Sequence, residues 1–235
     1  MPGIRAAKKH IAKLLSEPGW RESVDAITDM GLAGINALFS FLPLDARTMH
    51  RAAVCMGSSV ACLAGREIEP AQNIVRRMMW HMNEDSGNIG WGIPEAFAEV
   101  LVASEPLARR YNQILVSYVI ELPGSDNYCD NDVLRRSCYW AIGRLAEARP
   151  ALAAGARPWL TGGLEDRDVA CRGMAAWALG KLGPDKMDAL LLRRLAESGR
   201  GELCPLFDGD RVLEKSVSAL ARETFEMIDA GWISI

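Results

Sequence analysis

Apolar residues recur every three or four positions along nearly the whole chain, and this spacing predicts amphipathic helices. Two of the predicted helices are similar to each other. "RRSCYWAIGRLA" (135–146) and "CRGMAAWALGKLG" (171–183) carry Trp140 and Trp177 in equivalent positions. Self-similarity of this kind indicates a protein built from structural repeats.

Charged residues precede both helices in the same order. They are Asp130, Asp132 and Arg135 at the first helix, and Asp166, Asp168 and Arg172 at the second. An aspartate at a helix start accepts hydrogen bonds from backbone N–H groups and suits the positive end of the helix dipole. Gly143 and Gly180 follow the tryptophans, and their lack of a side chain lets a neighbouring helix come close.

The remaining pattern is also helical. Further helices are predicted at 106–121, 150–163 and 186–198, and no window shows sustained strand alternation. "GELCPLFDGD" (201–210), which includes Cys204, is interpreted as a long loop between helices.

We therefore predict an all-α fold, a right-handed α–α superhelix of the HEAT-like or armadillo type, made of antiparallel helix pairs. Residues 1–235 are expected to form a single repeat domain. In it, 1–19 is a capping helix and 20–230 supply about five helical pairs.

The motif "D-x-D-V-x-x-R…A-A-W-A-L-G-K-L-G" (166–183) resembles the HEAT-like repeats, and the resemblance extends over about 20–230. The segment 76–121, with "RRMMWHMNEDSGNIGWGIPEAFAEVL" and "YNQILVSYV", resembles an uncharacterised family of HEAT-like proteins associated with anaerobic, sulfate-reducing bacteria. This resemblance implies a fold and a bacterial lineage, and it implies no activity.

Composition narrows the possible partners. A net charge of −3 is unlike the basic footprint of nucleic-acid-binding proteins, so we do not expect a nucleic-acid partner. No segment reaches the roughly 18 consecutive apolar residues of a membrane span, and Lys8 and Lys9 precede a charged run unlike a secretory signal. The six cysteines form no CxxC, which predicts free thiols in a reducing compartment. We expect a cytoplasmic protein without a cofactor.

One segment, "MMWHMNEDSGNIGWGIPEAFAEV" (78–100), departs from the repeat pattern. A helix is predicted to end near Asn83, a loop to cover 84–90, and Pro94 to open the next helix. Tryptophan is enriched in the centres of protein interfaces, which favours a protein-binding surface here. The candidate binding residues are Trp80, Asn83, Glu84, Asp85, Ser86, Trp91, Glu95 and Glu99.

The acidic residues of this segment allow other interpretations. Glu95 and Glu99 lie on one helical face, so Arg76, Arg77, a bound cation or water is expected to offset their repulsion. His81 and Glu84 are weak metal-ligand candidates at a three-residue spacing. The carboxylates are also general acid or base candidates. In a purely structural interpretation, the tryptophans fill the core and the polar residues cap helix ends.

Three function classes follow. The leading hypothesis is a non-catalytic scaffold that binds a protein partner through the concave face, lined by helices 130–146 and 166–182, and through the 80–99 segment. The alternative is a HEAT-like enzyme, similar to bilin-lyase-related proteins or alkylpurine DNA glycosylases, that uses carboxylates of 84–99. The third is an accessory protein with a metal near 81–99. "GSDNYCDND" (124–132) lacks the register of a calcium loop and is interpreted as a solvated loop with a helix cap.

Overall fold

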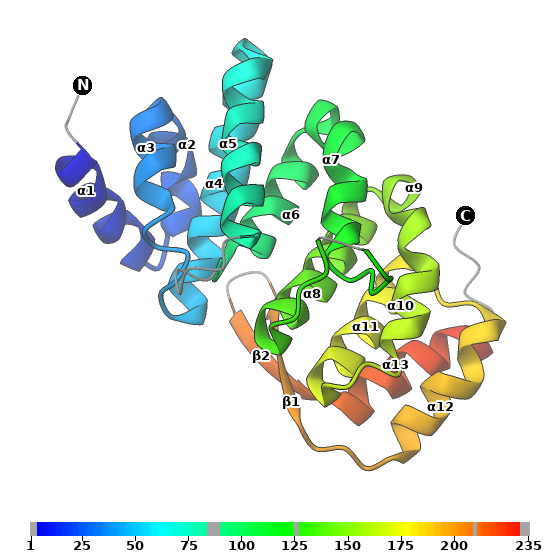
Figure 1. Ribbon diagram of the computed structural model, residues 1–235. Coiled ribbons are helices and arrows are strands. Elements are labelled where there is room, and N and C mark those ends of the chain that lie inside the picture. Colours follow the sequence, from blue (N-terminus) through cyan, green and yellow to red (C-terminus); the bar gives the residue numbers. More distant parts are fainter. Residues whose placement is uncertain (1–3, 84–89, 125–126, 209–210, 231–235) are drawn as a thin grey trace. The chain divides into compact units, whose positions relative to one another are not determined.

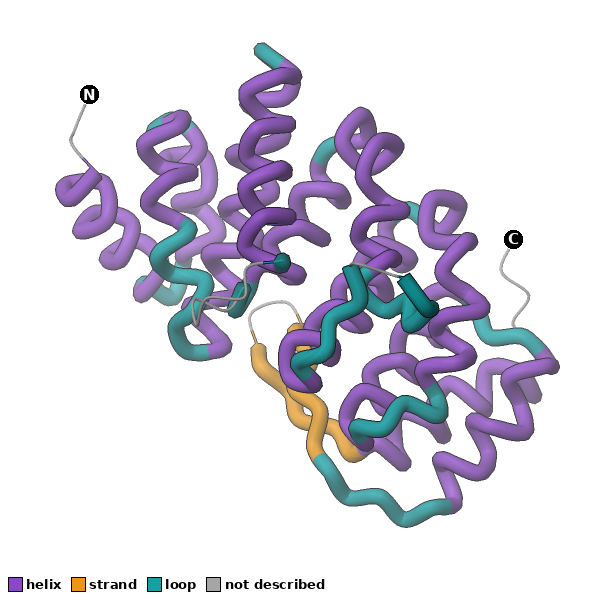
Figure 2. Tube along the Cα trace, viewed as in Figure 1, coloured by secondary structure: helices purple, strands orange, loops and turns teal. Residues whose placement is uncertain are grey.

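The computed structural model describes residues 4–83, 90–124, 127–208 and 211–230 (Figure 1). Helices make up most of this part of the chain, with one pair of short strands near the C-terminal end (Figure 2). Contacts between Cα atoms divide the chain into two compact units, Met1–Tyr111 and Asn112–Ile235, called unit 1 and unit 2 below. Within the described residues, none of the helices combines the length and apolar character that a membrane span requires.

Unit 1 is helical throughout its described part. Its elements are α1 (Ile4–Ser16), the short 3-10 helix η1 (Trp20–Ser23), α2 (Val24–Thr28), α3 (Gly31–Leu38), α4 (Ala46–Arg66), α5 (Ile68–Met82), α6 (Ile93–Ala103) and the first half of α7 (Glu105–Ser117).

The centre of unit 1 is α6, which packs closely along α4. Every residue of α6 from Ile93 to Leu101 is buried. Gly57 of α4 makes the close approach possible, because a Cβ there would lie 2.7 Å from the backbone oxygen of Glu99. Gly92, at φ +73°, starts α6 in a left-handed conformation that favours glycine.

A buried arginine attaches the N-terminal helix. Arg51 of α4 is 5% exposed, and its Nη1 donates to the carbonyls of Leu15 (2.5 Å) and Glu17 (3.2 Å) at the end of α1. The last carbonyls of a helix have no partner within the helix, so this arginine acts as a cap from another helix. The buried residues Ala7 and Ile11 of α1 complete the attachment.

Unit 2 contains the second half of α7 and the following elements: α8 (Asp132–Ala148), α9 (Pro150–Ala153), η2 (Ala154–Ala156), α10 (Arg157–Gly163), α11 (Val169–Leu182), η3 (Lys186–Asp188), α12 (Ala189–Glu197), β1 (Leu203–Asp208), β2 (Arg211–Ser216) and α13 (Val217–Asp229). Helices α8 and α11, which carry the two tryptophan repeats, pack against each other. A Cβ on Gly143 would overlap the ring of Trp177, so the repeat glycine allows the close approach that the sequence predicted.

The predicted loop at 201–210 is wrong. Strands β1 and β2 form an antiparallel hairpin in which Leu206 faces Leu213. Cys204 and Leu206 are buried and Leu203 is exposed, which is the alternation of a half-buried strand. The alternation covers only a few residues and includes Pro205, a residue that argues against strand in a sequence.

The hairpin covers part of the α8 and α11 pair. The ring of Phe207 meets Trp140 edge-on at 5.5 Å, and the Cys204 thiol donates to the carbonyl of Ala170 at 3.5 Å. A Cβ on Gly173 would lie 2.9 Å from the sulfur of Cys204. The two helices that we expected to line an open groove therefore use part of their surface to hold the hairpin.

Candidate recognition surface

The segment singled out by the sequence lies in unit 1, between α5 and α6. Helix α5 ends at Met82, and the backbone N–H of Asn83 caps it by donating to the carbonyls of Met79 and Trp80, both at 3.2 Å. Three of the candidate binding residues, Glu84, Asp85 and Ser86, lie outside the described residues, as does most of the predicted 84–90 loop. The described part resumes at Gly90, two residues before Gly92, which is the N-terminal cap of α6.

Trp80 is exposed, with 59% of its surface accessible. Its ring meets His81 edge-on at 5.1 Å, and the His81 ring lies 5.7 Å from Phe39. The interpretation of Trp80 as a core residue is therefore wrong. A side chain as large as that of tryptophan is usually mostly buried, so the exposed Trp80 stays a candidate contact residue.

A pocket of about 370 Å³ lies next to this aromatic group, and we call it the Trp91 pocket. Its basic side chains, Lys8, Arg77 and His81, come from two helices, α1 and α5. Its aromatic walls include Phe39 and Trp91, and no carboxylate is found among the described residues that line it.

The geometry of this pocket is fixed from one side. The guanidinium of Arg77 lies 3.9 Å from the centre of the Phe39 ring, and its Nη1 donates to Oδ1 of Asn36 at 2.8 Å. Stacking on an aromatic ring and a side-chain hydrogen bond both restrict the arginine, so its charge is held in place at low entropy cost. The pocket can accept a negative group beside an apolar or aromatic one.

Glu95 and Glu99 do not belong to this surface. Both are buried in α6, at 4% and 6% exposure, on a helix that packs against α4. The arginines expected to offset them have other partners: Arg76 donates to Glu69 at 2.9 Å, and Arg77 donates to Asn36. These two glutamates form part of the interior of unit 1.

No set of three metal-ligating side chains comes together within the described part of the chain. The metal hypothesis for His81 and Glu84 includes a residue outside that part, so it stays a prediction. The ring of His81 faces aromatic neighbours, Phe39 and Trp80.

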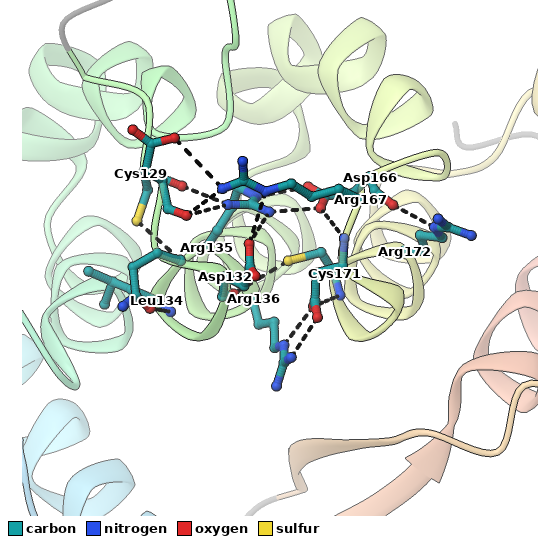
Figure 3. A network of polar contacts seen from close by, with 12 residues as sticks. Cys129, Asp132, Leu134, Arg135, Arg136, Asp166, Arg167, Cys171 and Arg172 are labelled. Carbon is teal, nitrogen blue, oxygen red and sulfur yellow. Dashed lines mark hydrogen bonds and ion pairs between the residues drawn. The ribbon is translucent and has the colours of Figure 1, made fainter.

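The repeated aspartates and arginines form a polar network around the buried Arg135 in unit 2 (Figure 3). Arg135 is fully buried and lies between Asp132 and Asp166. It makes a bidentate pair with Asp166, with both nitrogen–oxygen distances at 2.8 Å, and a third bond of 2.8 Å to Asp132. Burial opposes the charged form of Arg135, but the hydrogen bonds to Asp166 and Asp132 outweigh it and raise the arginine pKa.

A second pair joins the same two helices. Arg136 of α8 binds Asp168 through two contacts of 2.7 and 2.6 Å, and Asp168 also caps α11 by accepting from the backbone N–H of Cys171 at 2.8 Å. Burial raises the pKa of Asp168, but the hydrogen bonds from Arg136 and Cys171 outweigh burial and lower the pKa to about 2. The repeated charges thus hold the starts of α8 and α11 together.

The segment 124–132 contributes a helix cap. The side chain of Asn131 accepts from the backbone N–H of Leu134 at 3.0 Å and starts α8, as the sequence predicted. The six cysteines are free. Burial raises the pKa of Cys55 to about 12 and that of Cys204 to about 11, so both stay protonated and unreactive at neutral pH.

Comparison with known proteins shows the fold class and no function. A family model described as "HEAT-like repeat" matches residues 132–182, which span α8 to α11. Two solved structures of engineered proteins, both targets of the Northeast Structural Genomics Consortium, align over 97% of this chain. One has a TM-score of 0.56 at 15% identity with 92% of its own chain covered, and the other 0.55 at 18% with 90% covered.

No curated protein matches the sequence. The comparisons do not bear on the sulfate-reducing lineage suggested by the 76–121 segment. The chain has the all-α, superhelical repeat fold that the sequence predicted, and its residues 132–182 are similar to a HEAT-like repeat.

Proposed function

We propose that the protein is a non-catalytic scaffold that binds a protein partner through the surface formed by Trp80 and the Trp91 pocket. The observation that carries this proposal is the 59% exposure of Trp80 beside a pocket with cationic and aromatic walls. Tryptophan and arginine are the residues most enriched in interface hot spots. Helical-repeat proteins commonly bind other proteins.

The chemistry of the pocket describes the partner. Lys8 and Arg77 place positive charge at the rim, and Phe39 and Trp91 offer apolar area. The matching partner segment carries an aspartate or glutamate next to a large apolar residue. The carboxylate would meet Lys8 and Arg77, and the apolar side chain would cover Trp80 or enter the pocket.

The predicted concave face remains part of the proposal. Helices α8 and α11 are partly covered by the hairpin, so we place the main contact in unit 1 and not on this pair. The enzyme alternative relies on the carboxylates of 84–99, of which Glu95 and Glu99 are buried and absent from the lining of the Trp91 pocket, while Glu84 and Asp85 lie outside the described residues.

The test is capture of a partner by the tagged full chain and by two matched variants. Trp80→Ala removes the exposed tryptophan, and Met187→Ala removes an 86% exposed apolar side chain in unit 2. Captured proteins are quantified by mass spectrometry, and the melting temperature of each variant is recorded. Loss of the same protein with Trp80→Ala alone supports the proposal. Equal capture by all three proteins rejects this surface.

A further inference from the structure

Unit 2 contains a second pocket, of about 280 Å³, which we call the aromatic pocket. It lies where the chain segment after α7, helix α8, helix α10 and the loop before α11 meet. Its aromatic walls are Tyr128, Tyr139 and Trp159, and its carboxylates are Glu121, Glu165 and Asp166.

Two of these carboxylates keep an uncompensated charge. Asp166 is engaged by the bidentate pair with Arg135. The one cation in the described lining, Arg167, is directed to Asp132 at 3.2 Å. Glu121 and Glu165 are exposed and make no ion pair within the described part of the chain. The pocket therefore has a net negative charge on its rim.

The aromatic walls are built into the fold. Gly163 of α10 leaves room for Tyr139, because a Cβ there would lie 2.7 Å from the tyrosine hydroxyl. That hydroxyl donates to Oδ2 of Asp166 at 3.4 Å. Burial raises the pKa of Tyr128 to about 12, with the charges of Glu121 and Asp166 acting in the same direction and those of Arg135 and Arg167 opposing it. Both rings are neutral and electron-rich at pH 7.

The protein already uses one of these rings to hold a cation. The guanidinium of Arg135 lies 5.4 Å from the centre of the Tyr128 ring. The electron-rich face of an aromatic ring attracts a cation within about 6 Å of its centre. One side of the Tyr128 ring thus already lies near a guanidinium of the protein itself.

A larger, mainly apolar pocket adjoins the first. It measures about 490 Å³, shares Trp159 with the aromatic pocket, and includes Val116, Ile120 and Leu152. Trp159 therefore borders a negative compartment and an apolar one. A ligand that spans both needs a positive head and an apolar part a few bonds away.

We infer that the aromatic pocket binds an organic ammonium group that carries an apolar extension. Tyr139 and Trp159 supply aromatic faces, and Glu121 supplies the counter-charge. A calcium or magnesium ion fits poorly, because it requires about six oxygen ligands around one point. An alkylated ammonium is large, weakly hydrated and satisfied by rings and a distant carboxylate. The group is either a small amine or a lysine or methyl-lysine side chain of a partner protein.

The primary test is calorimetric titration of the full chain with choline chloride and with its neutral isostere 3,3-dimethylbutan-1-ol, at fixed ionic strength. The two probes have the same shape and differ in charge. Choline is expected to bind roughly tenfold more tightly, which lies between the effects of an exposed and a fully desolvated cation–π contact. Equal binding of the two probes, or binding of neither, overturns the inference.

Variants locate the site. Glu121→Gln is expected to weaken choline binding by roughly three- to tenfold, and the matched control Glu197→Gln, an exposed glutamate of α12 outside this pocket, leaves it unchanged. Glu121 is exposed, so its variant keeps the fold, and a melting curve verifies this. Trp159→Ala is also expected to weaken choline binding. Equal affinities of Glu121→Gln and Glu197→Gln place the binding elsewhere and contradict the assignment.

Two further probes identify the source of the group. Hexyltrimethylammonium tests the apolar pocket, since each buried methylene tightens binding by up to about fourfold. Peptides with lysine or trimethyl-lysine beside leucine test a protein origin. Tighter binding of a peptide than of choline assigns the site to a partner's side chain, and the reverse assigns it to a small amine. These results are independent of Trp80, so failure here leaves the proposed function of unit 1 untouched.

Discussion

Replacement of Arg135 by methionine tests the central claim about unit 2, that its repeated charges are structural. The arginine is fully buried, and its guanidinium holds the side chain of Asp166, which is 6% exposed. Arg135→Met keeps much of the volume and removes the charge. Asp166 then keeps a buried negative charge with its main partner lost.

The magnitude follows from that leftover charge. Loss of one member of a buried ion pair typically costs about 3–5 kcal/mol. For a chain of this size, 1 kcal/mol lowers the melting temperature by about 2–4 °C. Arg135→Met is therefore expected to lower it by roughly 6–20 °C. Partial compensation comes from Tyr139, whose hydroxyl still reaches Asp166 at 3.4 Å.

A matched control separates burial from charge. Arg167 pairs with the same Asp132, but its side chain is 57% exposed. An exposed ion pair contributes about 0–1 kcal/mol, so Arg167→Met is expected to change the melting temperature by at most a few degrees. Both variants lose one positive charge from the same network.

The assay is thermal unfolding followed by circular dichroism and by calorimetry. The double variant Arg135→Met/Asp166→Asn supplies a further check, because it removes the stranded charge. It is expected to lose less than the sum of the two single variants, with a coupling energy above about 1 kcal/mol. An equal, small effect of Arg135→Met and Arg167→Met would refute the reasoning.

Three other variants test the packing and the charges described above. The pKa of Asp168 is lowered from 3.8 to about 2, so its contribution of about 2 kcal/mol is complete above about pH 4 and is lost as the pH falls to about 2. Acid unfolding curves of Arg136→Met should show less of this loss, because only the bonds from Cys171 then lower the pKa. Gly143→Ala drives a Cβ into the Trp177 ring and should lower the free energy of unfolding by about 1–3 kcal/mol. Gly162→Ala, in a helix with open space around the residue, should leave it unchanged or raise it by up to about 1 kcal/mol. Denaturant titration measures both effects. Trp80→Ala removes a 59% exposed side chain and should change the free energy of unfolding by less than about 0.5 kcal/mol. A large loss of stability would show that Trp80 is part of the core.

The sequence predicted the fold class because a helical period of apolar residues is a direct physical requirement of stacked helices. It also singled out Arg135, Asp166 and Asp168, since charged residues precede both repeat helices in the same order. The hairpin was missed because Pro205 interrupts a very short alternation. A short strand pair that is held mainly by neighbouring helices leaves little trace in its own sequence.

The candidate site was predicted less well, and the reason is again physical. Periodicity shows which face of a helix is apolar, and it does not show how many neighbours the helix has. Glu95 and Glu99 share one face of α6, which suggested an exposed acidic face, yet α6 is buried on every side from Ile93 to Leu101. Burial of such glutamates depends on contacts from α4, which lies far away in sequence.

The tryptophans show the same limit most clearly. Trp80 and Trp140 each follow a pair of arginines in a helix, but Trp80 is 59% exposed and Trp140 is 3% exposed. Trp140 stacks on Trp177 at 6.3 Å and is met by Phe207 of the hairpin. Trp80 has His81 and an open surface instead. Stacking on the neighbouring repeat helix buries Trp140, whereas Trp80 lacks such packing, and this difference is the basis on which we propose Trp80 as a recognition residue.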